Sequence, residues 1–220
     1  MSNNVHFSRV LFHLPFWLLA LFAYSPILTA QSQPPSDVRV ADVRFSRDRP
    51  RIGGASWFAM EVRVDVRNNS NPTAPNRQFL DDVRVYAAMA HNLGTQSKPQ
   101  LEYFWIEVEA PTLERDTHTF RFYLSPEQIK RGQISSGEPY AWFVQVSYGQ
   151  TPSLEESSAP VAIAASNLLR GPGRLERFQE LLDAQKPERA GILLPQIETP
   201  FRDMYISETP TLRGNAGTKE

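Results

Sequence analysis

Beyond the first 30 residues the sequence has two histidines, His91 and His118, whose side chains suit acid–base catalysis. A catalytic triad also needs an activated nucleophile and an orienting acid, and His118 stands at the start of an alternating strand pattern. The sequence has no Gly-x-Ser-x-Gly elbow, no phosphate-binding glycine loop and no His-Glu-x-x-His helix. We therefore expect no catalytic residue and no enzyme.

Two pairs of acids, Asp81-Asp82 and Glu155-Glu156, are adjacent in the sequence. Neighbouring side chains on a strand point to opposite faces, so neither pair makes the two carboxylates of a glycosidase. The first pair also lacks the ligand spacing of a calcium loop. Cysteine is absent, which excludes thiolate catalysis, disulfides and cysteine zinc sites. We expect neither a metal nor a cofactor.

The 220 residues carry a net charge of −1, so the chain has no overall attraction to nucleic acid or to an acidic membrane surface. The 18 prolines outnumber the 11 glycines. A high proline content suits short strands joined by stiff loops better than long helices.

The first 30 residues have the pattern of a signal peptide. Arg9 precedes an apolar run over residues 10–24, and the small residues before Gln31 offer a cleavage site near Ala30. An uncleaved membrane anchor is the competing interpretation, but Pro15 and Pro26 bound an apolar stretch that is short for a spanning helix. We expect export to the periplasm or cell surface, with no membrane span after processing.

Alternating apolar and polar side chains between residues 37 and 170 predict half-buried strands. The parity of Val38 and Val40 differs from that of Val43 and Phe45, so we expect a bulge or a sheet switch near Ala41. The strongest row is in residues 139–148. The residues expected to face inward are Phe58, Met60, Val62, Val64, Val66, Val83, Val85, Ala87, Met89, Phe104, Ile106, Val108, Phe120, Phe122, Leu124, Tyr140, Trp142, Val144, Val146, Tyr148, Val161 and Ile163.

Helix signals are few. Ser125-Pro126-Glu127-Gln128 is typical of a capped helix start, and Gly132 ends that short helix. Residues 174–185 form an amphipathic pattern, and from Pro187 the prolines exclude regular helix. The sequence thus predicts a mainly β fold, an antiparallel sandwich of about seven strands over residues 31–170 with a short crossover helix. Residues 171–220 follow as a helix and a proline-punctuated tail.

Several large side chains are left over from the predicted core. Four rings have the parity opposite the inward rows and are candidates for a binding face, namely Tyr86, Tyr103, Trp105 and Tyr123. The tail carries apolar residues that need a surface to dock on, namely Leu175, Phe178, Leu181, Leu182, Ile192, Leu193, Leu194 and Phe201.

Three interpretations of these residues stay open. In the first, the helix and residues 192–194 fold back and cover the rings as a third layer. In the second, the rings form a protein–protein surface, such as a homo-oligomer interface. In the third, they are a platform for carbohydrate, which would also need polar groups that orient the sugar.

Two stretches resemble known families. Residues 137–146, Gly-Glu-Pro-Tyr-Ala-Trp-Phe-Val-Gln-Val, are similar to the sixth strand of fibronectin type III and related immunoglobulin-like sandwiches. The likeness implies that Tyr140 ties a loop corner to that strand. Residues 120–132, Phe-Arg-Phe-Tyr-Leu-Ser-Pro-Glu-Gln-Ile-Lys-Arg-Gly, follow a Val-Arg-Val strand at 83–85 and an aromatic strand at 101–108.

Together these elements resemble a family of small exported immunoglobulin-like proteins that some Gram-negative bacteria encode beside type IV pilus-type secretion components. The likeness covers residues 37–150 and implies an envelope or pilus context without catalytic residues. We therefore expect a non-enzymatic interaction protein of the bacterial envelope, with envelope or pilus-type proteins or a second copy as partners. A surface carbohydrate-binding module is the alternative.

Overall fold

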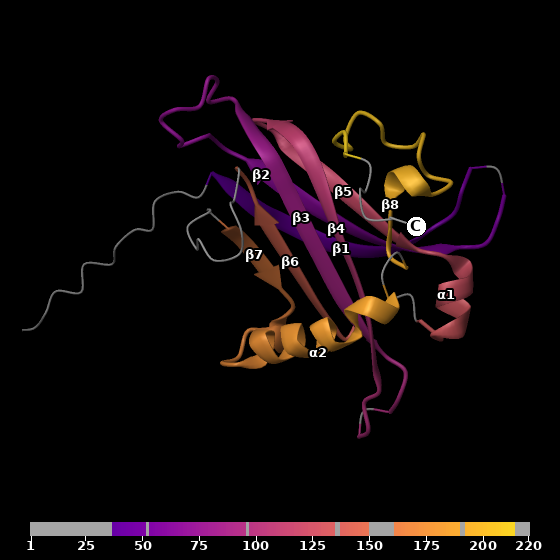
Figure 1. The fold of residues 1–220 in the computed structure, drawn as a ribbon. Coiled ribbons are helices and arrows are strands. Elements are labelled where there is room, and N and C mark those ends of the chain that lie inside the picture. The colour runs from indigo at the N-terminus through magenta and orange to yellow at the C-terminus, as the bar shows by residue number, and fades with distance from the viewer. Residues whose placement is uncertain are drawn as a thin grey trace, which may run out of the picture. The chain divides into compact units, whose positions relative to one another are not determined.

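The computed structural model describes residues 37–51, 53–95, 97–134, 137–149, 161–189 and 192–213 (Figure 1). The predicted signal peptide, residues 1–30, lies outside these ranges. Residues Pro34–Glu220 belong to one compact unit, to which everything below refers.

Two antiparallel sheets of four strands face each other. One has the order β1-β2-β5-β8, with β1 at Val38–Asp48, β2 at Trp57–Val66, β5 at Thr117–Leu124 and β8 at Leu194–Pro195. The other has the order β4-β3-β6-β7, with β3 at Phe79–Asn92, β4 at Leu101–Glu114, β6 at Ala141–Ser147 and β7 at Val161–Ala165. The described residues therefore contain the predicted seven strands and the two-residue β8. This arrangement confirms a mainly β, immunoglobulin-like sandwich.

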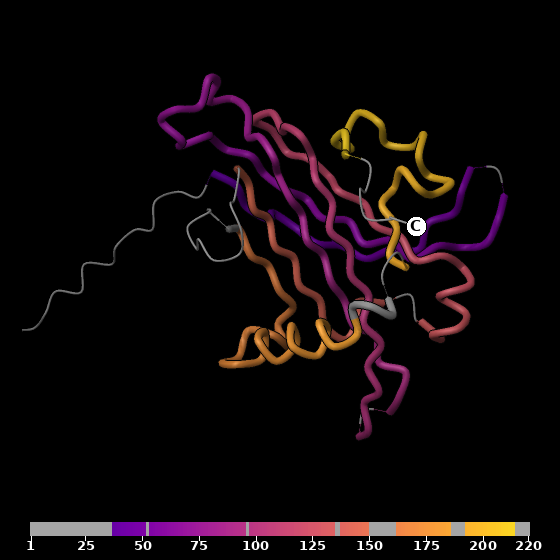
Figure 2. The backbone as a smooth tube through the Cα atoms, viewed as in Figure 1, coloured from indigo at the N-terminus to yellow at the C-terminus, as the bar shows by residue number. Residues whose placement is uncertain are grey.

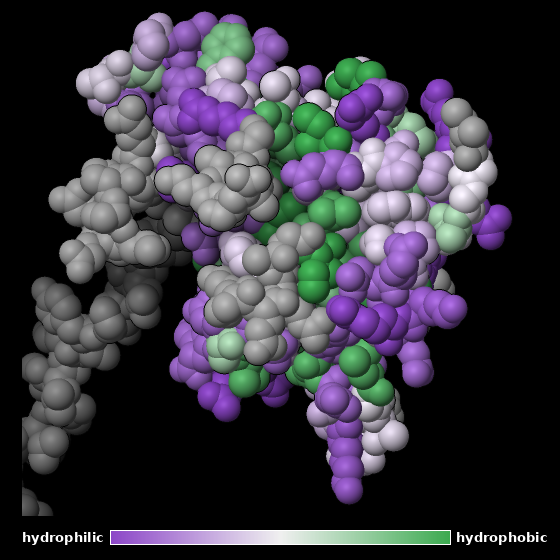
Figure 3. Space-filling model, turned by 45° about the vertical axis from the view of Figure 1, so that its right-hand side comes forward, coloured by the Kyte–Doolittle hydropathy of each residue, from purple (hydrophilic) through white to green (hydrophobic). Residues whose placement is uncertain are grey.

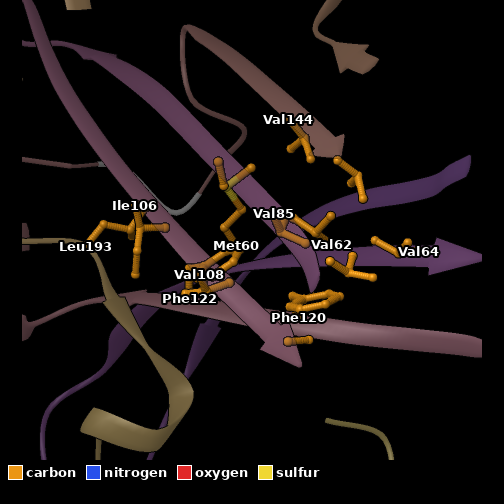
Figure 4. Packing of buried hydrophobic residues seen from close by; sticks show 14 of the residues in the cluster. Met60, Val62, Val64, Val85, Ile106, Val108, Phe120, Phe122, Val144 and Leu193 are labelled. Carbon is orange, nitrogen blue, oxygen red and sulfur yellow. The ribbon is translucent and has the colours of Figure 1, made fainter. Parts of the chain in front are cut away.

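Alternation along the strands builds the core between the sheets. The predicted inward rows of β2, β3, β4 and β5 are all buried there, and Met60, Val85 and Phe122 are 1% exposed or less. Burying one such side chain stabilises the fold by about 1.5–3 kcal/mol. Figure 4 shows these rows meeting from both sheets, with Leu193 at the same end of the core as Ile106.

The edge strands depart from a simple alternation. The register between β1 and β2 shifts between Val40 and Asp42, which confirms the predicted bulge. In β7 the prediction for Ile163 was wrong, since Ala162 is buried in the core and Ile163 is 56% exposed. The smaller alanine faces inward at this edge, and the larger side chain faces out.

Four helical segments accompany the sheets: α1 at Pro126–Arg131, α2 at Arg174–Arg189, and the 3₁₀ turns η1 at Asn167–Leu169 and η2 at Gln196–Glu198, counted within the described residues. The Ser125 hydroxyl accepts a hydrogen bond from the Gln128 amide, as the cap pattern predicted. The prediction that regular helix stops before Pro187 was wrong, because α2 continues past it to Arg189. A proline in the last turn removes only one intrahelical hydrogen bond, so the helix tolerates it there.

A tyrosine does link strand β6 to another part of the chain, but it is Tyr148 and not Tyr140. Tyr140 precedes β6 and is 44% exposed. The Tyr148 hydroxyl donates a hydrogen bond of 2.7 Å to Asp37 Oδ2. The same carboxylate oxygen accepts hydrogen bonds from the Ser70 amide, at 2.8 Å, and from the Ser70 hydroxyl, at 2.6 Å. Asp37 therefore joins the start of β1, the loop after β2 and the end of β6.

We predict that Tyr148→Phe lowers the free energy of unfolding by about 1.5–3 kcal/mol, the range typical of a hydrogen bond to a charged group. Chemical denaturation measures this loss. Tyr140→Phe is the matched control, since the same change at an exposed ring should stay within about 0.5 kcal/mol of the wild type. Equal effects of the two changes would contradict the role given to Tyr148.

Candidate functional site

The two histidines have different surroundings in the structure. His91 is 5% exposed, and its ring lies between those of Phe58, at 5.1 Å, and Phe104, at 6.0 Å. Burial, and to a smaller extent the charge of Arg47, lower the pKa of His91 to about 4. His118 donates from Nε2 to the Glu114 carbonyl oxygen at 2.8 Å. Within the described ranges, no three His, Asp or Glu side chains are grouped so that they could hold a metal ion.

The four predicted binding rings do not share one face. Tyr86 of β3 and Tyr103 and Trp105 of β4 are on the outer face of the β4-β3-β6-β7 sheet, where Tyr86 stacks on Trp105 at 6.1 Å. Tyr123 is on the outer face of the other sheet and is fully buried. The expectation of one aromatic face was wrong, because the strand pattern gives the parity of a residue but not the sheet to which its strand belongs.

Helix α2 covers the first group of rings. Phe178 lies 5.4 Å from Tyr103, and Leu182 packs into the same cluster with Leu175 at its border. Leu181 was also predicted to dock but is 37% exposed. It lies about 90° around the helix from the row of the other three, outside the stripe that meets the sheet. Burial raises the pKa of the Tyr86 and Tyr103 hydroxyls, which therefore stay neutral.

The C-terminal segment, residues 192–213, covers the remaining ring. Phe201 stacks on Tyr123 with centroids 4.5 Å apart and planes at 8°, and Trp57 meets both rings edge-on. The buried amide of Gln196 donates a hydrogen bond to the Phe201 carbonyl at 3.0 Å and another to the Met204 carbonyl. These bonds hold the segment in the turn that places Phe201 over β5.

The same segment closes the side of the sandwich between β5 and β4. Leu194 and Pro195 pair with Tyr123 and Phe122 of β5, which places Leu193, 1% exposed, in the core. Ile192 packs at the border of that core. Further along, the Arg213 amide donates to the Glu109 carbonyl of β4 at 2.8 Å. Figure 2 shows this yellow segment on the side of the sandwich opposite the orange strand β7.

An ionic cluster secures the closure. Arg121 of β5, with a side chain 5% exposed, pairs with Glu61 of β2 at 3.2 Å and with Glu208 of the segment at 2.7 Å. Its guanidinium also lies over the Tyr205 ring at 4.2 Å. A buried cation whose partners come from both the sheet and the segment holds the two together. Of the three interpretations, the covering layer describes helix α2, whereas residues 192–194 lie at the core and along β5 and Phe201 covers Tyr123.

The opposite side of the sandwich, between β1 and β7, keeps a groove of about 820 Å³. Its walls are the bulged part of β1, the outer edge of β7 and the turn that leads from η1 into α2. Trp142 lines the groove, its ring packs against Phe45 at 6.2 Å, and its Nε1 donates to Glu138 at 2.6 Å. The larger apolar side chains that line it are Val40, Val43, Trp142, Ile163, Leu169 and Leu175, and the charged residues Asp42, Arg170 and Glu176 line it as well.

The sequence-based prediction missed this groove. A local signal exists in residues 161–165, Val-Ala-Ile-Ala-Ala, which lack the charged residues that alternate along β1 and β2. That β7 ends beside the β1 bulge depends on the packing of the two sheets, which no local pattern contains. Figure 3, which brings the side with the C-terminal segment forward, shows hydrophobic residues gathered in a band between hydrophilic ones on that face.

Comparison with known proteins shows the fold. The crystal structure of a protein from Akkermansia muciniphila is similar to this chain with a TM-score of 0.56 at 19% sequence identity. The similarity covers 84% of this chain and 97% of that one, so it extends over both sheets. No family model matches the sequence, and no curated protein matches it. No helix in the described parts is long and apolar enough to cross a membrane.

Proposed function

We propose that this protein is an exported, non-enzymatic interaction component of the bacterial cell envelope, associated with a pilus-type or secretion apparatus. Its partner binds on the side of the sandwich between β1 and β7. The signal pattern of residues 1–30 supports export, and the resemblance of residues 37–150 supports the envelope context.

The observation that carries the proposal is the difference between the two sides of the sandwich. Residues 192–213 fill one side with Leu193 and bridge β5 to β4. The other side presents two strand edges, an exposed Ile163 and a groove lined by both apolar and charged side chains. Residues 192–213 already cover the side between β5 and β4. The side between β1 and β7 is therefore the surface better suited to a partner.

The carbohydrate platform has less support. Tyr103 is 3% exposed under α2 and Tyr123 is fully buried under Phe201. A sugar that stacks on a ring needs that ring's face, and in both cases a protein side chain occupies it. The proposal therefore uses the groove and not the rings.

Site-specific photocrosslinking in cells that export the protein tests the proposal. A photoreactive residue at position 163 should give a discrete crosslinked adduct with another envelope protein. The matched control is the same residue at position 197, since Ile197 is 54% exposed and Ile163 is 56% exposed, but Ile197 lies on the closed side. An adduct at position 197 and none at position 163 would refute the proposed binding side.

A further inference from the structure

Strand β7 is an edge that nothing in its own sequence protects. Proteins usually block an exposed strand edge with charges, proline or a bulge. At the neighbouring edge, β1 carries the bulge at Ala41 and an ion pair between Arg44 and Asp42 at 2.5 Å. Residues 161–165 have none of these devices, and β6 is the neighbour that β7 pairs with in its sheet. The backbone groups on the outer edge of β7 therefore remain available to another strand.

The edge of β7 lies in a recess. The groove is lined on one side by residues 40–43 of β1 and on the other by the turn of residues 170–173 and the start of α2. A second sheet cannot approach an edge with walls on both sides, but one extended chain can. Five residues of strand span about 16 Å, the length of β7 itself.

On the opposite side of the sandwich, a segment of the chain itself lies beside the edge of a sheet. There residues 192–195, Ile-Leu-Leu-Pro, lie extended beside β5, pair with two of its residues and insert Leu193 between the sheets. At the β7 side, Trp142 and Val43 border the core in the corresponding way and line the groove. The groove thus has a backbone edge and apolar side chains, the two kinds of contact that residues 192–195 make on the closed side.

Three charged residues line the groove, and one of them, Asp42, is already paired with Arg44. Arg170 and Glu176 both line the groove and are exposed. Within the described parts of the chain, neither the Arg170 guanidinium nor the Glu176 carboxylate has a side-chain hydrogen bond or an ion pair. A strand with an apolar centre and an acidic residue placed near Arg170 would match the groove, because arginine and carboxylate pair through strong charge-assisted bonds.

We infer that an extended segment of a partner protein adds to β7 as a fifth strand of the β4-β3-β6-β7 sheet. The segment is about five residues long, with alternating apolar side chains that face Trp142 and Val43 and an acidic residue at Arg170. This mode of recognition draws affinity from the main chain and specificity from alternate side chains. The inference rests on the proposed function and specifies how the partner is held.

The test uses the protein purified from a bacterium that expresses the full sequence and exports it. The probe is a pool of eight-residue peptides with Val, Ile, Leu or Phe at four alternate positions and Ser, Thr or Asp between them. Peptides that bind are resynthesised with N-methyl groups on alternate backbone amides, which removes hydrogen bonds and keeps the side chains. Fluorescence anisotropy measures affinity, and amide hydrogen exchange locates the bound strand.

We expect at least a tenfold loss of affinity on N-methylation and on Ile163→Lys, since a charge on an edge strand opposes pairing. Ile197→Lys, the matched control on the closed side, should bind like the wild type. Slower amide exchange in residues 161–165 should accompany binding. Ala41→Trp, which fills the groove from the exposed bulge, should also weaken binding at least tenfold.

Three results would overturn the inference: no peptide in the pool binds, N-methylated peptides bind equally well, or protection appears away from residues 161–165. The crosslinking at position 163 separates this failure from failure of the proposed function. An adduct at 163 combined with any of these results keeps the β1–β7 side as the binding side and rejects strand addition. An adduct at 197 and none at 163 refutes the proposed binding side itself.

Discussion

Truncation after Arg189 is expected to abolish the cooperative unfolding transition. The change removes Leu193 from the core and Phe201 from the surface of Tyr123. Truncating a buried leucine costs about 2–5 kcal/mol and a buried phenylalanine about 3–5 kcal/mol. Together these losses, about 5–10 kcal/mol, are comparable to the total stability of about 5–15 kcal/mol that is typical of a domain. Thermal denaturation followed by circular dichroism measures the outcome.

Two controls separate loss of packing from loss of chain length. Truncation after Arg213 keeps every contact of the segment described above and should leave the transition unchanged. Leu193→Ala should lower the unfolding free energy by about 2–3 kcal/mol, whereas Ile197→Ala, at a side chain 54% exposed, should change it by less than about 0.5 kcal/mol. If the protein truncated after Arg189 unfolds at the wild-type temperature, residues 192–213 do not contribute to the stability of the sandwich.

Acid should destabilise the protein through His91. The pKa of this buried histidine is lowered to about 4, whereas an unfolded histidine titrates near 6.5. Between these values the unfolded chain binds a proton that the folded protein does not, so stability falls as the pH is lowered through that window. The loss amounts to about 3 kcal/mol and is complete below pH 4. Protonation would place a second cation beside Arg47 in an aromatic pocket.

Unfolding free energies measured by urea denaturation from pH 7.5 to pH 4 check this prediction. In His91→Leu, the part of the acid slope that comes from this histidine should disappear. If His91→Leu and the wild type lose the same free energy between pH 6.5 and pH 4, His91 does not titrate as the structure implies.

The alternation of side chains was sufficient to predict the sandwich. Each of β2, β3, β4 and β5 has one row of large apolar residues, and a strand of period two can bury only one row in one core. The bulge near Ala41 followed from the same rule, because Val40 and Val43 cannot face one core without an extra residue between them. The strands and the bulge depend on residues that are neighbours in the sequence, so a local pattern is enough to predict them.

The outer layers could not be predicted in the same way. Tyr103 and Tyr123 have the same outward parity, but one lies under α2 and the other under Phe201 on the opposite sheet. Contacts between residues about 75 positions apart, such as Tyr103 with Phe178, leave no periodic trace in either segment. The same holds for Tyr148 and Asp37, whose hydrogen bond joins residues 111 positions apart.

Hydrogen–deuterium exchange of the unmodified, exported protein tests most directly whether the chain closes one side of its sandwich and leaves the other open. Amides between residues 193 and 209 include the Glu208 and Thr209 donors to Tyr205 and should exchange as slowly as those of β2. Groove-facing amides of residues 161–165 should exchange much faster than those that pair with β6. Fast exchange throughout residues 193–209 together with uniform protection of β7 would contradict the account.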